Sequence, residues 1–392
     1  MLNDTNSSQT SLWFDYFSLS VAVILIVLCV FGVLANSLST LVFLRLRPVS
    51  INLLLAGIST TYTLLNLLAL LSLVPGPLVS FFQQSLLFKI HVYALKFAYP
   101  LTAVFYCASI WLLLLITVER WLAVCKPFLV AKCCTRERAK YSIVSVLLLS
   151  VLYNSVRFWE FDIVQTNGTV APVPVLRASK VYMLWYETVA NLLFVYVLPL
   201  GSLICFNLMT ALEIVRANKE RKKISRSQEA RHHTAKMMLY LIVVFIACFS
   251  LTFLLNLLET LLPHLFQTNI GFALNDCTNV LVILNASIAP FFYWRFSSRY
   301  RIIMMVTFVS CCCCCYNNQL RRSALICQEA TFVTSVQVSK KKKDCYLSAR
   351  KRGELSPCLA PRRRKNSQSL RIRSTQTGQL KQFRLSCQTS TL

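Results

Sequence analysis

The 392-residue chain is 56% hydrophobic and only 14% charged, with a mean hydropathy of +0.57. About a quarter of the residues of a soluble domain are charged, so this composition excludes a single water-soluble core and requires a lipid solvent. The net charge of +26 suggests nucleic acid, but the basic residues avoid the apolar stretches and collect in a few loops and in the tail. Nucleic acid is therefore not an expected partner.

Seven stretches are long and apolar enough to span a membrane, which takes about 20 residues of helix. Each must be helical, because backbone groups that face lipid have no water to bond. The stretches are residues 19–44, 51–74, 93–124, 138–157, 183–214, 235–262 and 269–294. The predicted fold class is all-α membrane, a seven-transmembrane helix bundle.

The distribution of Lys and Arg predicts how the bundle is oriented, because cytoplasmic loops carry the excess of these residues. Five of the 41 basic residues fall on one side: Lys89, Lys96, Arg157, Arg177 and Lys180. We therefore expect a multi-pass protein of the cell membrane with its N-terminus outside. Residues 1–18 would be the extracellular N-terminus, 19–300 the bundle and 301–392 the cytoplasmic tail. Residues 1–18 lack the basic start and cleavage site of a signal peptide, so none is expected.

Three glycosylation sequons begin at Asn3, Asn6 and Asn167, and all three fall on the predicted outer side. A fourth sequon, at Asn285, lies inside the last apolar stretch, where no glycan can be attached. The positions of the usable sequons agree with the orientation predicted from charge.

Five consecutive cysteines follow the last predicted span: Cys311, Cys312, Cys313, Cys314 and Cys315. Cytosolic cysteines close to the membrane and to basic residues indicate palmitoylation. A metal cluster is the alternative, but contiguous cysteines lack the spacing that zinc coordination favours. We expect acylation, and no bound metal or cofactor.

The tail after about residue 316 is rich in Lys, Arg, Ser, Thr and Gln and is expected to be disordered. The basic runs 340–343 and 362–365 would lie on anionic membrane lipids, each residue contributing about 1 kcal/mol near the surface. A nuclear signal is the alternative for these runs, and the seven upstream spans argue against it. Phosphorylation of Ser356, Ser367 or Ser369 would weaken the membrane contact.

Transporters tend to place charged groups at mid-membrane and to contain broken helices. The predicted helix interiors here carry almost no charge, apart from Glu119 and Arg120 at the end of the third span. Motifs of hydrolases, metalloproteases and nucleotide-binding enzymes are absent from the sequence. We therefore expect a protein that is not an enzyme, and we keep a channel or transporter as a distant alternative.

Several short motifs resemble those of rhodopsin-like G-protein-coupled receptors, in the same order and on the same helices. Glu119-Arg120-Trp121 resembles the E/D-R-Y triad, and Phe245-x-x-Cys248-Phe249 resembles the sixth-helix switch F-x-x-C-W. Ala289-Pro290-x-x-Tyr293 resembles N-P-x-x-Y, while Asn36 and Pro199 match anchor positions of the first and fifth helices. The resemblance implies a short amphipathic helix from Arg295 to Arg301. It also implies that Arg120 pairs with its acidic neighbour at rest and meets the G protein when active.

A closer resemblance is to invertebrate FMRFamide-type neuropeptide receptors. It is carried by residues 36–39, 50–52, 99–101, 119–127, 134–140, 153–160 and 256–259, of which 119–127 reads E-R-W-L-A-V-C-K-P. This resemblance implies an extracellular peptide ligand, a heterotrimeric G protein as partner, and arrestin and kinases acting on the tail. The alternative is a chemosensory seven-helix receptor for a small pheromone or lipid.

The chain departs from the family pattern at several positions. Tyr62 stands where the family keeps a sodium-binding Asp, and a phenol cannot serve as that ligand. Arg231 replaces the acid that would hold Arg120, so we expect raised basal activity. Leu95 lies near the expected third-helix cysteine and residues 157–182 contain no cysteine, so no outer disulfide can form and the second loop is expected to be looser. Three further changes are Ala289 for the usual Asn, Leu251 for the sixth-helix Pro, and a missing fourth-helix Trp.

Amidated RF peptides end in a cationic Arg and an aromatic amide, so acids near the outer helix ends are candidates for binding them. The five acids are Glu160, Asp162, Glu187, Glu259 and Asp276. Ordinary solvated loop acids are the alternative reading for each. On the inner side we expect Arg120, Tyr293 and the basic loop 216–231 to contact the G protein.

Overall fold

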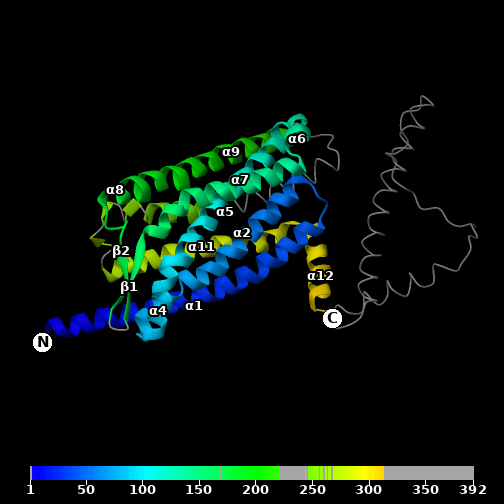
Figure 1. The fold of residues 1–392 in the computed structure, drawn as a ribbon. Helices are drawn as coiled ribbons and strands as arrows, with labels where there is room; N and C mark the ends of the chain where they lie inside the picture. Colours follow the sequence, from blue (N-terminus) through cyan, green and yellow to red (C-terminus); the bar gives the residue numbers. More distant parts are fainter. Residues whose placement is uncertain are drawn as a thin grey trace, which may run out of the picture. The chain divides into compact units, whose positions relative to one another are not determined.

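The computed structural model describes residues 2–166, 169–219, 243, 246–255, 257–258, 261–262, 264–265 and 268–312. Helices dominate this part of the chain (Figure 1). The first half contains α1 (Leu2–Arg45), α2 (Ser50–Ser72), α3 (Pro75–Phe82), α4 (Ser85–Tyr93), η1 (Ala94–Ala98), α5 (Tyr99–Cys125), α6 (Pro127–Cys133), α7 (Arg136–Asn154) and η2 (Ser155–Trp159). The second half contains β1 (Phe161–Thr166), β2 (Thr169–Pro174), α8 (Lys180–Tyr182), η3 (Met183–Ala190), η4 (Leu192–Val197), α9 (Leu198–Lys219), α11 (Asn269–Phe296) and α12 (Ser298–Cys312).

Six helices among the described residues are long and apolar enough to cross a membrane. They are Trp13–Arg45, Ser50–Val79, Ser85–Cys125, Arg136–Trp159, Lys180–Arg216 and Asn269–Phe296. They coincide with six of the seven predicted spans. The remaining one, 235–262, is described only in part and contains the apolar helix Ile246–Leu255. The prediction of an all-α membrane bundle is confirmed.

The helix boundaries differ from the predicted ones mainly at the ends. Helix α1 already begins at Leu2, so the segment 1–18 that we predicted as separate is largely helical. The third span begins at Ser85 rather than at residue 93. Helix α12 covers Ser298–Cys312 instead of the shorter amphipathic stretch, so the tail predicted from residue 301 is helical up to Cys312. Apolarity fixes the middle of a span, whereas its ends depend on caps and packing.

Two of the long helices widen into π-helical turns immediately before a proline. Segment η1 precedes Pro100, and η4 precedes Pro199. A proline donates no backbone hydrogen bond, and its ring crowds the carbonyl four residues earlier. Those carbonyls belong to Lys96 and Val195, which both lie inside the π-helical segments. The wider turn relieves the crowding without ending the helix.

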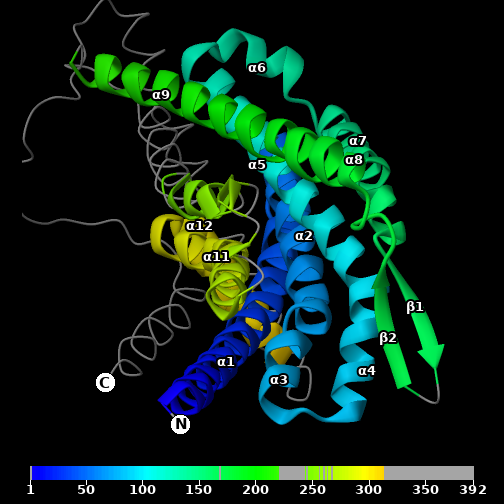
Figure 2. The ribbon, with the colours of Figure 1, turned by 90° about the vertical axis from the view of Figure 1, so that its left-hand side faces the viewer.

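The long helices pack side by side (Figure 2). Their apolar residues are divided between a buried interior and an exposed exterior. Helix α1 lies against α2 and α11, and α5 contacts α2, α7 and α9. Leu25, Ile58 and Leu113 are at most 1% exposed within this interior. The outward faces are apolar as well, for example at Leu152, which is 69% exposed. An exposed apolar exterior is the arrangement required when lipid rather than water surrounds the bundle.

Polar side chains join α1, α2 and α11 near the middle of the bundle. Asn36 Nδ2 donates to the carbonyl of Ala286 (3.1 Å), and Ser287 Oγ lies 2.9 Å from Asn66 Oδ1. A Cβ added at Gly32 would stand 2.5 Å from both Asn66 Oδ1 and Ser287 Oγ. Close backbone approach through a small residue, with side-chain hydrogen bonds between helices, is how membrane helices associate.

The segment between α7 and α8 forms an antiparallel hairpin of β1 and β2, whose register runs from Phe161 opposite Pro174 to Thr166 opposite Thr169. The hairpin, α4 and the beginning of α1 lie at one end of the bundle, and α6 and α12 lie at the other (Figure 1). We call these the hairpin end and the α12 end.

Candidate functional site

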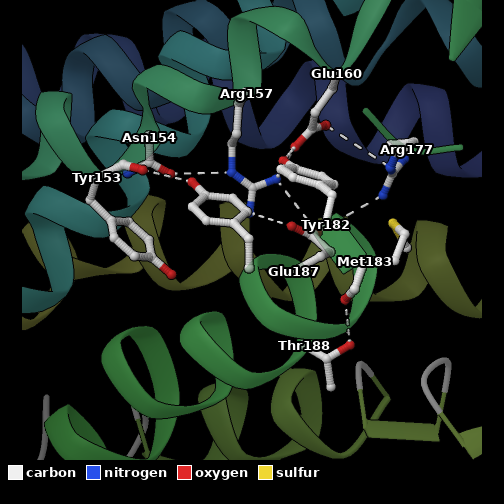
Figure 3. A network of polar contacts seen from close by, with 10 residues as sticks. Tyr153, Asn154, Arg157, Glu160, Arg177, Tyr182, Met183, Glu187 and Thr188 are labelled. Atoms are coloured by element: carbon white, nitrogen blue, oxygen red, sulfur yellow. Dashed lines mark hydrogen bonds and ion pairs between the residues drawn. The ribbon is translucent and has the colours of Figure 1, made fainter. Parts of the chain in front are cut away.

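A group of charged side chains is buried at the hairpin end, where α7, the hairpin and η3 meet (Figure 3). Arg157, in η2 at the end of α7, is only 5% exposed. Its Nη1 lies 3.0 Å from Glu160 Oε1, and its Nη2 lies 2.9 Å from Glu187 Oε2. Its Nε donates to Asn154 Oδ1 at 3.2 Å. The guanidinium is thus directed at Asn154 and Glu160, which are each three residues away, and at Glu187, which is 30 residues away.

The two carboxylates of this group are paired with arginines, although Oε2 of each is buried without a hydrogen-bond partner. Glu160 is fully buried and accepts a hydrogen bond from the Tyr182 hydroxyl. Arg177, just after β2, lies 4.0 Å from Glu160 and 3.9 Å from Glu187. Two arginines therefore balance two glutamates, and the group as a whole carries no net charge. A buried carboxylate needs such a partner, because an isolated charge away from water is costly.

Two of the five predicted ligand-binding acids, Glu160 and Glu187, thus lie together, but arginines of the chain itself already occupy them. Asp162 in β1 lies apart from this group, and its side chain is 67% exposed and 3.4 Å from Lys96 Nζ. The backbone N–H of Ile163 and then Lys96 lower the pKa of the Asp162 carboxyl. Glu259 lies outside the described residues.

Asp276 differs from Glu160, Asp162 and Glu187, the other candidate acids that the structure describes. It lies in α11 and is partly buried, and no hydrogen bond or ion pair joins it to any of the described residues. Its carboxylate thus has no partner among the described residues, whereas the carboxylates of Glu160 and Glu187 each lie within 4.0 Å of two arginines.

An aromatic cluster joins η4 to the apolar helix Ile246–Leu255. The Phe249 ring is 4.9 Å from that of Tyr196, which is 5.6 Å from Phe253. Phe249 is 3% exposed. The structure therefore buries the residue that the sequence suggested as a replacement for the aromatic switch. Phe245, the other switch residue of this segment, lies outside the described residues.

Glu119 and Arg120 lie near the α12 end, in the last turns of α5. Ser50 Oγ donates to Glu119 Oε2 at 2.8 Å, which joins the start of α2 to α5. No ion pair within 4.0 Å joins Glu119 to Arg120, and Arg120 Nε is buried without a hydrogen-bond partner. The acid of the motif therefore bonds a serine instead of the neighbouring arginine that the resemblance implied. The adjacent Trp121 packs on Phe206 of α9, with ring centroids 5.2 Å apart.

Tyr293 and the preceding Pro290 lie in α11 and are both buried. The Tyr293 ring packs 5.1 Å from Phe43 and 5.7 Å from Tyr300. The Tyr300 hydroxyl lies 2.6 Å from Ser39 Oγ, so α1, α11 and α12 meet at this point.

The predicted modification sites are only partly described. Asn3 and Asn6 lie in the first turns of α1, and Asn167 lies outside the described residues. Cys311 and Cys312 end α12, whereas 313–315 are not described. In the described ranges, no three His, Cys, Asp or Glu side chains are grouped as a metal ion would require. These residues remain predictions.

Residues 59–293 match the family model described as 7 transmembrane receptor (rhodopsin family). The chain belongs to this family. It is 30% identical to the FMRFamide peptide receptor frpr-18 of Caenorhabditis elegans, over 72% of this chain and 67% of that protein. It is 28% identical to the FMRFamide receptor of Drosophila melanogaster, over 71% of this chain and 52% of that protein. The resemblance that the sequence motifs suggested is thereby confirmed, and the receptor is a multi-pass membrane protein.

Sequence reasoning missed the role of Arg157. The charge pattern places it only as one basic residue on the sparsely charged side, and the motif Arg157-Phe158-Trp159-Glu160 indicates only the family resemblance. An Arg and a Glu three residues apart at the end of an apolar helix are the signal that could have indicated a buried pair. Glu187 is 30 residues away from Arg157, so the chain-local pattern contains no sign of it.

Proposed function

We propose that this receptor binds an extracellular neuropeptide of the amidated RF type and couples its binding to a heterotrimeric G protein. The observation that carries the proposal is the similarity to two receptors named for FMRFamide, from a nematode and an insect. Signalling requires two conformations of the bundle, one of which the peptide binds more tightly.

In this proposal the hairpin end faces the outside and the α12 end faces the cytoplasm. The excess of Lys and Arg at the predicted inner loops supports this orientation. The glycans would then be carried by Asn3, Asn6 and Asn167, and the fatty acyl chains by Cys311 to Cys315. Arrestin and kinases would act on the tail after residue 312.

Asp276 is the acid we assign to the arginine of the peptide. Glu160 and Glu187 are neutralised by Arg157 and Arg177, so their site has no net charge to offer a cation. Asp162 is mostly exposed and paired with Lys96. A partly buried carboxylate without a partner gains more from a guanidinium than a solvated one, because water screens it less.

At the cytoplasmic end, Arg120 is the residue we assign to G-protein contact, together with Tyr293 and the basic segment 216–231. The support is that Arg120 has no ion pair among the described residues that would have to break first. We infer raised basal signalling from the same observation, and R231E tests it by restoring an acid. Lower basal second-messenger levels in R231E are expected, and unchanged levels would contradict the inference.

The test of ligand class is a calcium and cAMP assay in cells that express the full chain, with a library of amidated RF peptides and the same peptides as free acids. An amidated peptide should elicit a response, and D276N should weaken its potency at least about tenfold, because a charge-assisted pair is lost. D162N is the matched control and should change potency little. Surface expression of each variant is measured by an N-terminal tag. No response to any amidated peptide from a receptor present at the surface would contradict the proposal.

A further inference from the structure

The β1–β2 hairpin is too small to be stable by itself. It has two strands of six residues, and an isolated two-stranded hairpin is marginally stable at best in water. Its position on the bundle must therefore be held by contacts outside its own ladder.

Those contacts are charged, and they lie at both feet of the hairpin. Glu160 directly precedes β1, and Arg177 follows β2 by three residues. The N–H of Val175 donates to the carbonyl of Glu160 at 2.9 Å, which closes the base. Arg177 then lies 3.9 Å from Glu187, so the foot after β2 is paired with η3.

Two further contacts join the hairpin to the long helices. Arg157, fixed to Asn154 of α7, pairs with Glu160 at one foot and with Glu187 in η3. On the other side, Lys96 Nζ of η1 donates to the Phe161 carbonyl at 2.8 Å, where β1 begins. Three helical segments are thus attached to the same few residues, and the contacts of Arg157 with Glu160 and Glu187 are drawn in Figure 3.

No covalent link duplicates these contacts, because residues 157–182 contain no cysteine. Lys96 directly follows Leu95, which lies near the position where the family pattern has its third-helix cysteine. The contact of Lys96 with the Phe161 carbonyl is therefore made at the level of the helix where that cysteine would stand. We propose that Lys96, Arg157, Glu160 and Glu187 form a charge clamp that positions the hairpin on the bundle in place of a disulfide. In this proposal they are positioning residues, which act through the hairpin.

The clamp has a physical property that a disulfide lacks. A reductant does not break it. The clamp does depend on each charge keeping its partner, because removing one charge leaves the opposite charge buried and unpaired. A surface pair of the same length offers a matched control: Lys140 Nζ lies 3.0 Å from Glu137, but the two side chains are 48% and 64% exposed. Exposed pairs contribute little, since water screens them.

The experiment is hydrogen–deuterium exchange, read by mass spectrometry, on the full-length receptor in detergent without any peptide. E187Q keeps the shape of the side chain and removes its charge, and K96M removes the contact to Phe161. Exchange at the hairpin amides of 161–166 and 169–174 should become at least about tenfold faster in E187Q and about threefold faster in K96M. Exchange in α2 should stay unchanged in both, which separates loss of positioning from general unfolding.

K140M and wild-type receptor treated with the reductant TCEP should both show the wild-type rate at the hairpin. The clamp is overturned if E187Q and K96M exchange at the wild-type rate, or if TCEP alone accelerates exchange. If E187Q is not recovered as folded protein, K96M decides by itself, because Lys96 lies in η1 and its side chain is 21% exposed. No peptide enters the measurement, so a receptor that fails to respond to RF peptides leaves this result unaffected.

Discussion

The two ends of the bundle treat a buried arginine in opposite ways. At the hairpin end Arg157 is held by two glutamates, an asparagine and the rings of two tyrosines, Tyr99 at 6.0 Å and Tyr186 at 5.5 Å. At the α12 end Arg120 has no ion pair among the described residues, and its acidic neighbour is bonded to Ser50. A satisfied charge fixes structure, whereas an unsatisfied one remains available to a new partner. An arginine thus fixes the structure at the hairpin end, whereas at the α12 end an arginine without an ion pair among the described residues is left for a new contact.

The largest effect on stability is expected from removing the paired arginine, Arg157. R157M leaves Glu160 and Glu187 buried with only Arg177 nearby at 3.9–4.0 Å. Removing one partner of a buried pair costs about 3–5 kcal/mol, so we expect a lower thermal midpoint in detergent and reduced surface expression. A thermal midpoint of R157M equal to that of the wild type would show that the ion pairs of Arg157 do not stabilise the hairpin end, and that the two ends do not differ in this respect.

A smaller loss is expected at the other end from S50A. This variant removes the hydroxyl that donates to Glu119 at 2.8 Å. A hydrogen bond to a charged group contributes about 1.5–3 kcal/mol, less when the freed group reaches water, and Glu119 is partly exposed. We expect a drop in the free energy of unfolding of about 1 kcal/mol, measured by denaturant titration. Thr63, whose hydroxyl donates to the Ser59 carbonyl of its own helix, provides a control in T63A.

R120M should change stability least among the buried positions, in contrast to R157M. The removed side chain has a buried Nε without a hydrogen-bond partner and makes no ion pair with a described residue. We expect the thermal midpoint to stay the same or to rise while peptide-stimulated signalling disappears. A fall comparable to that of R157M would indicate that Arg120 is paired after all.

The smallest effect is expected from acid pH at the exposed link between Asp162 and Lys96. The folded-state pKa of Asp162 is lowered by the Ile163 N–H and by Lys96. The stability contributed by such a group is present above its unfolded pKa and lost as the pH falls through its folded pKa. Hairpin exchange, corrected for the intrinsic rate, should therefore stay constant from pH 7 to pH 5 in wild type. D162N should show the same profile, and a loss of protection specific to wild type in this range would contradict the assignment.

The sequence motifs predicted much of the receptor correctly, for reasons that can be named. Six spans and the family followed from apolar runs and from the order of Asn36, Arg120 and Pro290 along the chain. The expectation of a looser outer loop stays a prediction: the absence of cysteine removes one kind of link, whereas ion pairs join the feet of the hairpin to the helices. Glu160 and Glu187 stay untested as ligand contacts, and their internal partners argue for the clamp instead.

The amino-acid sequence by itself determined that lipid surrounds this protein, where its membrane spans lie along the chain and to which family it belongs. These properties depend on composition and on patterns within about 20–30 residues. Only the tertiary structure decided which charges are paired: Arg157 meets Glu187 across 30 residues, and Ser50 meets Glu119 across 69. The physical reason is that a buried charge pairs with the group that the packed helices bring within about 3 Å. The residues next to it in the sequence do not determine that partner.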